Sequence, residues 1–186
     1  MILLAGYFLS IVGAIKNSFA YVLGLALFFS WLGDCFLIFK QDKLFFILGL
    51  AAFLVAHIAY IITFYKFKKV ISSLTIFSIV AVFVFYTLML MYMLWPELGE
   101  MLVPVILYAI VLTLMGITGV VRNLRVNKLP VIGVMLFVVS DSLIAYTKFV
   151  EPLYLGGFII MSTYIVAQFL IVKGLSERFL KEIEIK

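Results

Sequence analysis

Long apolar runs set the strongest limit on what this 186-residue chain can fold into. A transmembrane α-helix needs about 20 consecutive, predominantly apolar residues, with a range of about 17 to 25. Scanning for such runs predicts seven segments, at residues 1–15, 21–39, 43–65, 73–95, 101–121, 129–149 and 153–173. We therefore expect an all-α fold, a polytopic membrane helix bundle with seven transmembrane helices, in which residues 1–186 form a single transmembrane domain.

The composition supports a membrane protein. Hydrophobic residues make up 67% of the chain and charged residues 12%, whereas about 25% of the residues in an average soluble domain are charged. Residues 1–15 are the weakest segment, because at about 1.5 Å per residue they reach only ~22 Å across a hydrocarbon core of ~30 Å. They lack a basic amino-terminal region and a small-residue cleavage site, which disfavours a cleaved signal peptide.

The distribution of basic residues predicts the orientation in the membrane, since Lys and Arg are retained on the cytoplasmic side. One predicted face holds Lys16, Lys66, Lys68, Lys69, Arg122, Arg125, Lys128, Lys173, Arg178, Lys181 and Lys186. The other face holds Lys40, Lys43 and Lys148 together with Asp42, Glu97, Glu100 and Glu151. We expect a multi-pass protein of the cell membrane with its C-terminus in the cytoplasm. This topology explains the net charge of +5, so no nucleic-acid partner is expected.

Two aspartates interrupt the apolar runs, Asp34 between Gly33 and Cys35, and Asp141 between Ser140 and Ser142. A carboxyl group inside a membrane helix costs several kcal/mol unless it faces a cavity, a partner or a proton pathway. The helices predicted at 21–39 and 129–149 are separated by an even number of crossings, so they run parallel and can bring both carboxyls to a similar depth. Two carboxyls in one low-dielectric site cannot both ionise cheaply, which favours an acid/base pair. The structural alternative is that each aspartate only hydrogen-bonds neighbouring helices.

Other polar residues in the apolar runs are candidates for binding. His57, the only histidine, and Tyr60 are three residues apart, and Tyr164 and Gln168 are four apart, so each pair shares a helix face. A histidine satisfied by packing is the alternative for His57. One histidine with two aspartates is a thin ligand set for zinc, and no Gly-x-Ser-x-Gly elbow accompanies a serine, so neither a metal nor a cofactor is expected. Tyr108 belongs to the remaining polar exceptions, for which bonding within the helix or an interfacial position suffices.

Four segments resemble the YhhN-like lysoplasmalogenase family of multi-pass membrane proteins. They are residues 29–37 (FSWLGDCFL), 49–61 (GLAAFLVAHIAYI), 137–145 (FVVSDSLIA) and 163–171 (TYIVAQFLI). The resemblance implies cleavage of the vinyl ether bond of a lysoplasmalogen, a lysophospholipid substrate, to a fatty aldehyde and a glycerophospho-base. By motif correspondence it implies that Asp34 and Asp141 are the acidic catalytic residues. The other polar positions of the family correspond to His57, Tyr60, Tyr164 and Gln168, which we take as substrate-binding.

The chain also departs from the family pattern. Family members usually have eight membrane helices with a Lys-Pro pair opening the second, whereas seven helices and no such pair are predicted here. A helix ahead of Met1 would complete the count. Two other functions are compatible with these residues. One is a proton-coupled membrane transporter or carrier with the aspartates as a proton relay, and the other is a non-catalytic membrane scaffold. Membrane lipid is an expected partner in each case, and the oligomeric state stays open.

Overall fold

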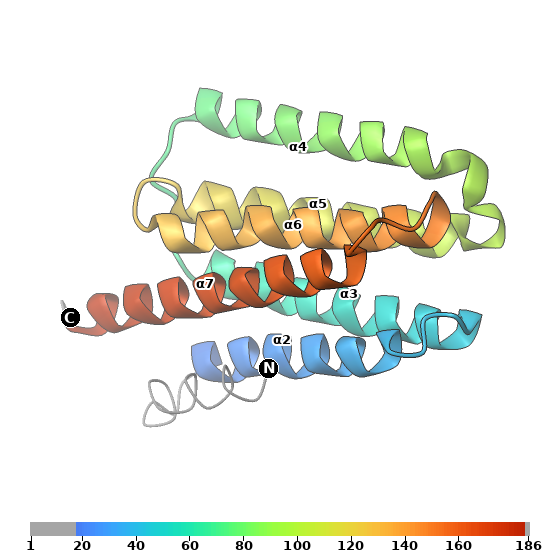
Figure 1. The fold of residues 1–186 in the computed structure, drawn as a ribbon. Helices are drawn as coiled ribbons and strands as arrows, with labels where there is room; N and C mark the ends of the chain where they lie inside the picture. Colours follow the sequence, from blue (N-terminus) through green and yellow to red (C-terminus); the bar gives the residue numbers. More distant parts are fainter. Residues whose placement is uncertain (1–17, 185–186) are drawn as a thin grey trace.

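The computed structural model describes residues 18–184, which form a bundle of six long helices (Figure 1). They are α2 (Ser18–Leu37), α3 (Lys43–Tyr65), α4 (Ser73–Leu94), α5 (Leu102–Asn123), α6 (Lys128–Phe149) and α7 (Gly156–Glu184). Two short 3-10 helices, η1 (Trp95–Glu97) and η2 (Gly99–Met101), connect α4 to α5. All six long helices are long and apolar enough to cross a membrane, which confirms the all-α membrane fold. The segment predicted over residues 1–15 lies outside the described residues, so the structure has six membrane helices against the seven predicted.

Side-chain caps start three of the helices at the residues where the apolar runs begin. Asp42 Oδ1 accepts the amide N–H of Leu44 at 2.7 Å, and Asn127 Oδ1 accepts that of Leu129 at 3.0 Å. Ser72 Oγ accepts the N–H of Thr75 at 3.3 Å. Each cap satisfies an N–H group that would otherwise have no partner in the first turn of its helix. Polar residues between the apolar runs therefore mark where α3, α4 and α6 begin.

The last helix is longer than predicted, because α7 continues to Glu184 rather than ending near residue 173. Its final turns are amphipathic rather than apolar, so they lie beyond the apolar run from which the helix was predicted. Arg178 is 5% exposed there. Its guanidinium donates to Asn123 Oδ1 at 3.1 Å and to the carbonyl of Lys68 at 3.2 Å. These bonds connect the end of α7 to the end of α5 and to the loop after α3.

Successive helices run in opposite directions, so α2 and α6 are parallel, as predicted (Figure 1). In this view α4 lies at the edge of the bundle opposite α2. Phe83 and Leu94 are the only buried residues of α4, whereas α3 and α5 each have ten buried residues. The site therefore lies among α2, α3, α5, α6 and α7, with α4 covering one side.

Glycine allows α6 and α7 to approach closely. A Cβ atom at Gly133 would lie 2.8 Å from the carbonyl oxygen of Ala167 and 2.9 Å from the amide nitrogen of Ile171. Both neighbours are backbone atoms, which cannot move aside as a flexible side chain can. Small residues at such a crossing let two membrane helices pack backbone to backbone. This contact sets the position of α6 against the face of α7 that carries Tyr164 and Gln168.

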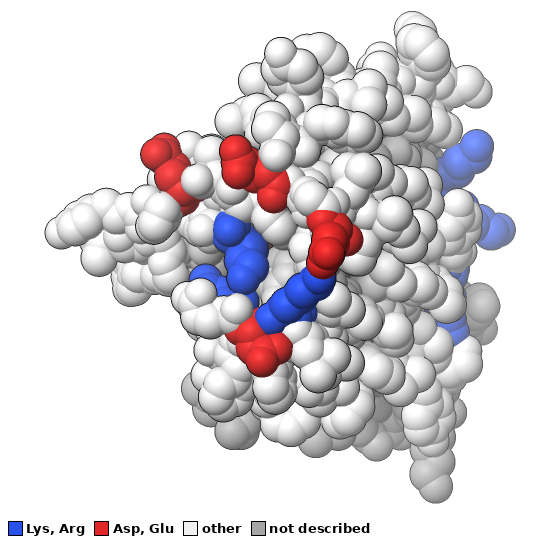
Figure 2. All heavy atoms as spheres, turned by 90° about the vertical axis from the view of Figure 1, so that its right-hand side faces the viewer, with Lys and Arg blue, Asp and Glu red and all other residues white. Residues whose placement is uncertain are grey.

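Charged side chains gather at the two ends of the bundle. Figure 2 looks onto one end and shows Asp and Glu side chains around a hollow that contains Lys side chains. The loops and helix ends on this side carry Lys40, Asp42, Lys43, Glu97, Glu100, Lys148 and Glu151. The ammonium group of Lys43 pairs with the carboxylate of Glu100. The grouping matches the less basic face predicted from the sequence.

Candidate active site

Asp141 is buried in the middle of α6 and is held by Tyr108 of α5. The Tyr108 hydroxyl donates a hydrogen bond to Asp141 Oδ2. The second oxygen, Oδ1, has no hydrogen-bond partner among the described residues. A buried polar atom without a partner is uncommon in a folded protein and points to a missing water or ligand. Asp141 therefore has one carboxyl oxygen, Oδ1, that is available to bind a water molecule or a ligand.

The serines on either side of Asp141 bond to the helices. Ser140 Oγ donates to the carbonyl of Ile160 on α7 at 3.0 Å, and Ser142 Oγ donates to the carbonyl of Val138 at 2.7 Å. The Tyr86 hydroxyl of α4 in turn donates to Ser142 Oγ at 2.8 Å. These bonds fix the turn of α6 around Asp141 from both sides without using the carboxyl group.

His57 of α3 lies beside Asp141. Its Nε2 atom is 3.5 Å from Asp141 Oδ2, and its side chain is fully buried. Within the described part of the chain neither ring nitrogen of His57 makes a hydrogen bond. The imidazole meets the rings of Tyr108 and Phe137 edge to face, with centroids 5.3 and 5.1 Å away. A histidine with both nitrogens unpaired next to a carboxyl can orient a water molecule or a substrate oxygen.

Asp34 belongs to a second polar cluster, formed by α2, α3 and α7. The Tyr164 hydroxyl donates to Asp34 Oδ2 at 3.1 Å, and Gln168 Nε2 donates to the Tyr164 oxygen at 3.3 Å. The Tyr60 hydroxyl donates to Gln168 Oε1. Tyr60, Tyr164 and Gln168 are buried, and Asp34 is half-buried. This chain of hydrogen bonds ends on the Asp34 carboxyl, so the position of that carboxyl depends on the side chains of Tyr60, Gln168 and Tyr164.

Two phenylalanines, Phe53 and Phe137, lie between the Asp141 cluster and the Asp34 cluster and contact both. The ring centroid of Phe137 lies 5.1 Å from that of His57 and 5.5 Å from that of Tyr164. Phe53 lies 6.4 Å from His57 and 5.9 Å from Tyr164 by the same measure. The six residues predicted for the site thus form two adjacent groups. One contains His57 and Asp141, and the other contains Asp34, Tyr60, Tyr164 and Gln168. Their joint role in one reaction stays a prediction.

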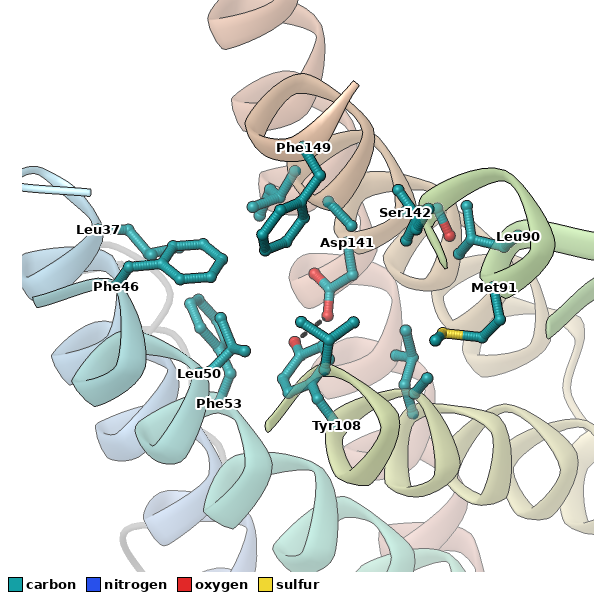
Figure 3. Close-up of a pocket in the computed structure, with 16 residues that line it drawn as sticks. Leu37, Phe46, Leu50, Phe53, Leu90, Met91, Tyr108, Asp141, Ser142 and Phe149 are labelled. Carbon is teal, nitrogen blue, oxygen red and sulfur yellow. Dashed lines mark hydrogen bonds between the residues drawn. The ribbon is translucent and has the colours of Figure 1, made fainter. Parts of the chain in front are cut away.

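An apolar pocket opens on the Asp141 side of these aromatic rings (Figure 3). Its cavity volume is about 50 Å³, and α2, through Leu37, and α3, α4, α5 and α6 contribute its lining. Asp141, Tyr108 and Ser142 are the polar residues in that lining, and the rest are apolar, including Phe46, Leu50, Met91 and Phe149. In Figure 3 one Asp141 oxygen meets Tyr108 and the other points toward the side on which Phe46 and Phe149 lie. Asp34 is not among the residues that line this pocket.

Tyr108 is the site residue that the sequence did not single out. The only signal in the sequence was a phenol within an apolar run, which is equally typical of an interfacial tyrosine. Its position on α5 gives no indication that α6 supplies its partner. Among residues 18–184 no group of three or more His, Cys, Asp or Glu side chains could hold a metal ion.

Comparison with known proteins gives a consistent set of relatives. The sequence profile of the YhhN family matches residues 1–175. Human lysoplasmalogenase TMEM86B is 33% identical over 146 residues, covering 78% of this chain and 59% of the human protein. The rat protein of the same name is 31% identical over 155 residues, covering 83% and 61%. The pig protein is 29% identical over 152 residues, covering 82% and 62%. The chain thus spans about three fifths of the length of these curated relatives, and no solved structure matches it.

Proposed function

This chain belongs to the YhhN family, and from that we propose that it is an integral membrane hydrolase of the lysoplasmalogenase type. It would cleave the sn-1 vinyl ether of a lysoplasmalogen to a fatty aldehyde and a glycerophospho-base. The relatives named lysoplasmalogenase support the reaction class. The observation that carries the proposal is the free, buried Oδ1 of Asp141 on the wall of an apolar pocket.

Vinyl ether hydrolysis requires an acid that can protonate carbon. Protonation of the outer alkene carbon gives an oxocarbenium ion, water adds to the carbon next to the ether oxygen, and the resulting hemiacetal collapses to aldehyde and alcohol. A carboxylic acid in a dry site can donate this proton, as one does in glycoside hydrolysis. The apolar pocket would hold the first carbons of the hydrocarbon chain and expose the alkene to Asp141.

The bond from Tyr108 decides which Asp141 oxygen would carry the proton. The Tyr108 hydroxyl donates to Oδ2, so Oδ2 acts as an acceptor. A proton on the acid is then held by Oδ1, the oxygen without a protein partner. This arrangement supports Asp141 as the acid that faces the substrate.

The second carboxyl and the histidine would complete the reaction. After Asp141 gives up its proton, its carboxylate is the anion nearest the oxocarbenium ion, and His57 lies 3.5 Å from it with two unpaired nitrogens. His57 would orient the attacking water and accept its proton. Asp34 would be the second carboxyl group of the acid/base pair, on the other side of the phenylalanine rings. Its carboxyl is held by a hydrogen bond from Tyr164, which Gln168 and Tyr60 hold in turn.

The test is aldehyde release by the purified protein. Lysoplasmalogen should yield aldehyde in proportion to protein concentration, and the saturated alkyl-ether analogue should bind without reacting, because it has no alkene carbon to protonate. A chain that binds both lipids and releases no aldehyde would contradict the hydrolase. Proton-coupled uptake by vesicles containing the protein would then support the carrier function.

A further inference from the structure

A polar hollow lies at the end of the bundle shown in Figure 2, apart from the apolar pocket. Its cavity volume is about 340 Å³. The loop after α2 contributes Lys40 and Gln41, the end of α6 contributes Thr147 and Lys148, and the start of α7 contributes Gly156 and Gly157. The hollow therefore joins the ends of the same two parallel helices that carry Asp34 and Asp141.

Lys148 connects this hollow to the apolar pocket. Its ammonium group donates to the carbonyl of Lys40 at 2.7 Å and lies 5.1 Å from the centroid of the Phe46 ring, and Phe46 lines the apolar pocket. A lysine has three N–H donors, so donors remain for a ligand. Within the described residues neither Lys40 nor Lys148 pairs with a carboxylate, whereas Lys43 on the same face pairs with Glu100.

The charges of the hollow suit an anion. Two half-buried lysines, Lys40 and Lys148, line one cavity, and the amino-terminal end of the 29-residue helix α7 contributes to its wall. Both features favour a phosphate group. The acidic residues of the same end, including Asp42, Glu97 and Glu151, are exposed to solvent, where they would attract a positively charged base.

The spacing along α6 matches a lysophospholipid. Lys148 follows Asp141 by seven positions, about 10 Å along a helix. The alkene carbon that Asp141 would protonate is separated from the phosphorus of a lysoplasmalogen by seven bonds, roughly 8 Å when extended. A charge-assisted hydrogen bond adds about 3 Å. One molecule can therefore reach from the Asp141 carboxyl to the lysines.

We propose that the hollow lined by Lys40 and Lys148 binds the phosphate of a zwitterionic glycerophospho-base headgroup. The proposal rests on the hydrolase function, because it takes the lipid cleaved at Asp141 to be the one held here. It makes the two lysines determinants of specificity for phospholipid over neutral glycerol ethers.

The experiment measures binding, so that it does not depend on catalysis. Purified wild-type protein, Lys40→Gln and Lys148→Gln are titrated with two ligands that cannot react, a saturated alkyl-ether lysolipid carrying phosphoethanolamine and the corresponding alkylglycerol without phosphate. Each variant should bind the phospholipid about 10-fold more weakly, the effect of losing one charge-assisted hydrogen bond, and should bind the alkylglycerol as the wild type does. Lys148→Arg keeps the charge and should retain most of the affinity.

Lys43→Gln is the matched control, since Lys43 lies on the same face but not in the hollow. It should bind both ligands as the wild type does. Equal weakening of both ligands by the hollow variants, or no weakening of either, would overturn the headgroup assignment. Competition by inorganic phosphate as strong as that of the lysolipid would overturn it in favour of a free-anion site. Lysine-dependent phospholipid binding by a wild type that releases no aldehyde would support the headgroup site and contradict the hydrolase.

Discussion

His57 Nε2 lies 3.5 Å from Asp141 Oδ2, yet the hydrogen bond to that oxygen comes from the hydroxyl of Tyr108. Three helices thus converge on one carboxyl group: α3 through His57, α5 through Tyr108 and α6 through Asp141 itself. A phenol that donates to one oxygen leaves the other oxygen as the place for a transferable proton. The unpaired imidazole remains available for water.

The two aspartates should be separately required for catalysis. Replacing Asp141 or Asp34 by Asn removes the transferable proton or the negative charge while nearly preserving size. We expect each variant to lose aldehyde release by at least about 100-fold, the low end of general acid catalysis. Asp42→Asn is the control, because Asp42 caps α3 at the surface and Asn caps a helix equally well. Undiminished release by either site variant would remove that aspartate from the mechanism.

Tyr108→Phe should lower turnover without removing it. Loss of the hydroxyl frees Asp141 Oδ2, so the proton is no longer confined to the oxygen that faces the pocket. The expected loss in kcat is about 10-fold, the effect of one hydrogen bond of ~1.4 kcal/mol. Tyr86→Phe also removes a hydroxyl contact, a partly buried one to Ser142, and should leave kcat within about twofold of the wild type. Equal effects of the two substitutions would argue that Tyr108 acts only through packing.

Gly133→Ala should destabilise the bundle. The added methyl group would sit 2.8 Å from the Ala167 carbonyl oxygen and force α6 and α7 apart. Overpacking of this kind costs about 1–3 kcal/mol, which thermal unfolding in detergent can measure. Gly157→Ala is the control, because no atom lies within 4 Å of its Cβ position. A Gly133→Ala protein as stable as the wild type would show that the two helices can separate at little cost.

Cysteine labelling should establish the orientation. Cys35 is the only cysteine, so a Cys35→Ser background allows single reporters at exposed Lys69 and Glu97, which lie at opposite ends of the bundle. With the basic end in the cytoplasm, an impermeant maleimide added to intact cells should label Glu97→Cys and spare Lys69→Cys. The reverse pattern would invert the topology and place the headgroup hollow on the cytoplasmic side.

The sequence by itself determined where the helices lie and which of their residues are too polar to face lipid. Apolar length is a local property, and the predicted segment 43–65 coincides with α3. The cost of a carboxyl group in hydrocarbon also depends on the residue alone, so Asp34 and Asp141 were identifiable without coordinates. The amphipathic end of α7 was missed because its burial comes from contacts with α5 and with the loop after α3.

Only the tertiary structure decided which polar groups meet. Periodicity placed Tyr164 and Gln168 on one face, but it gave no indication that this face turns to Asp34, or that Tyr108 rather than His57 bonds Asp141. In a membrane bundle nearly every helix face is apolar, so hydrophobicity does not select neighbours. The choice depends on close backbone contacts such as that at Gly133 and on hydrogen bonds between helices, which are relations between distant segments and not properties of any one of them.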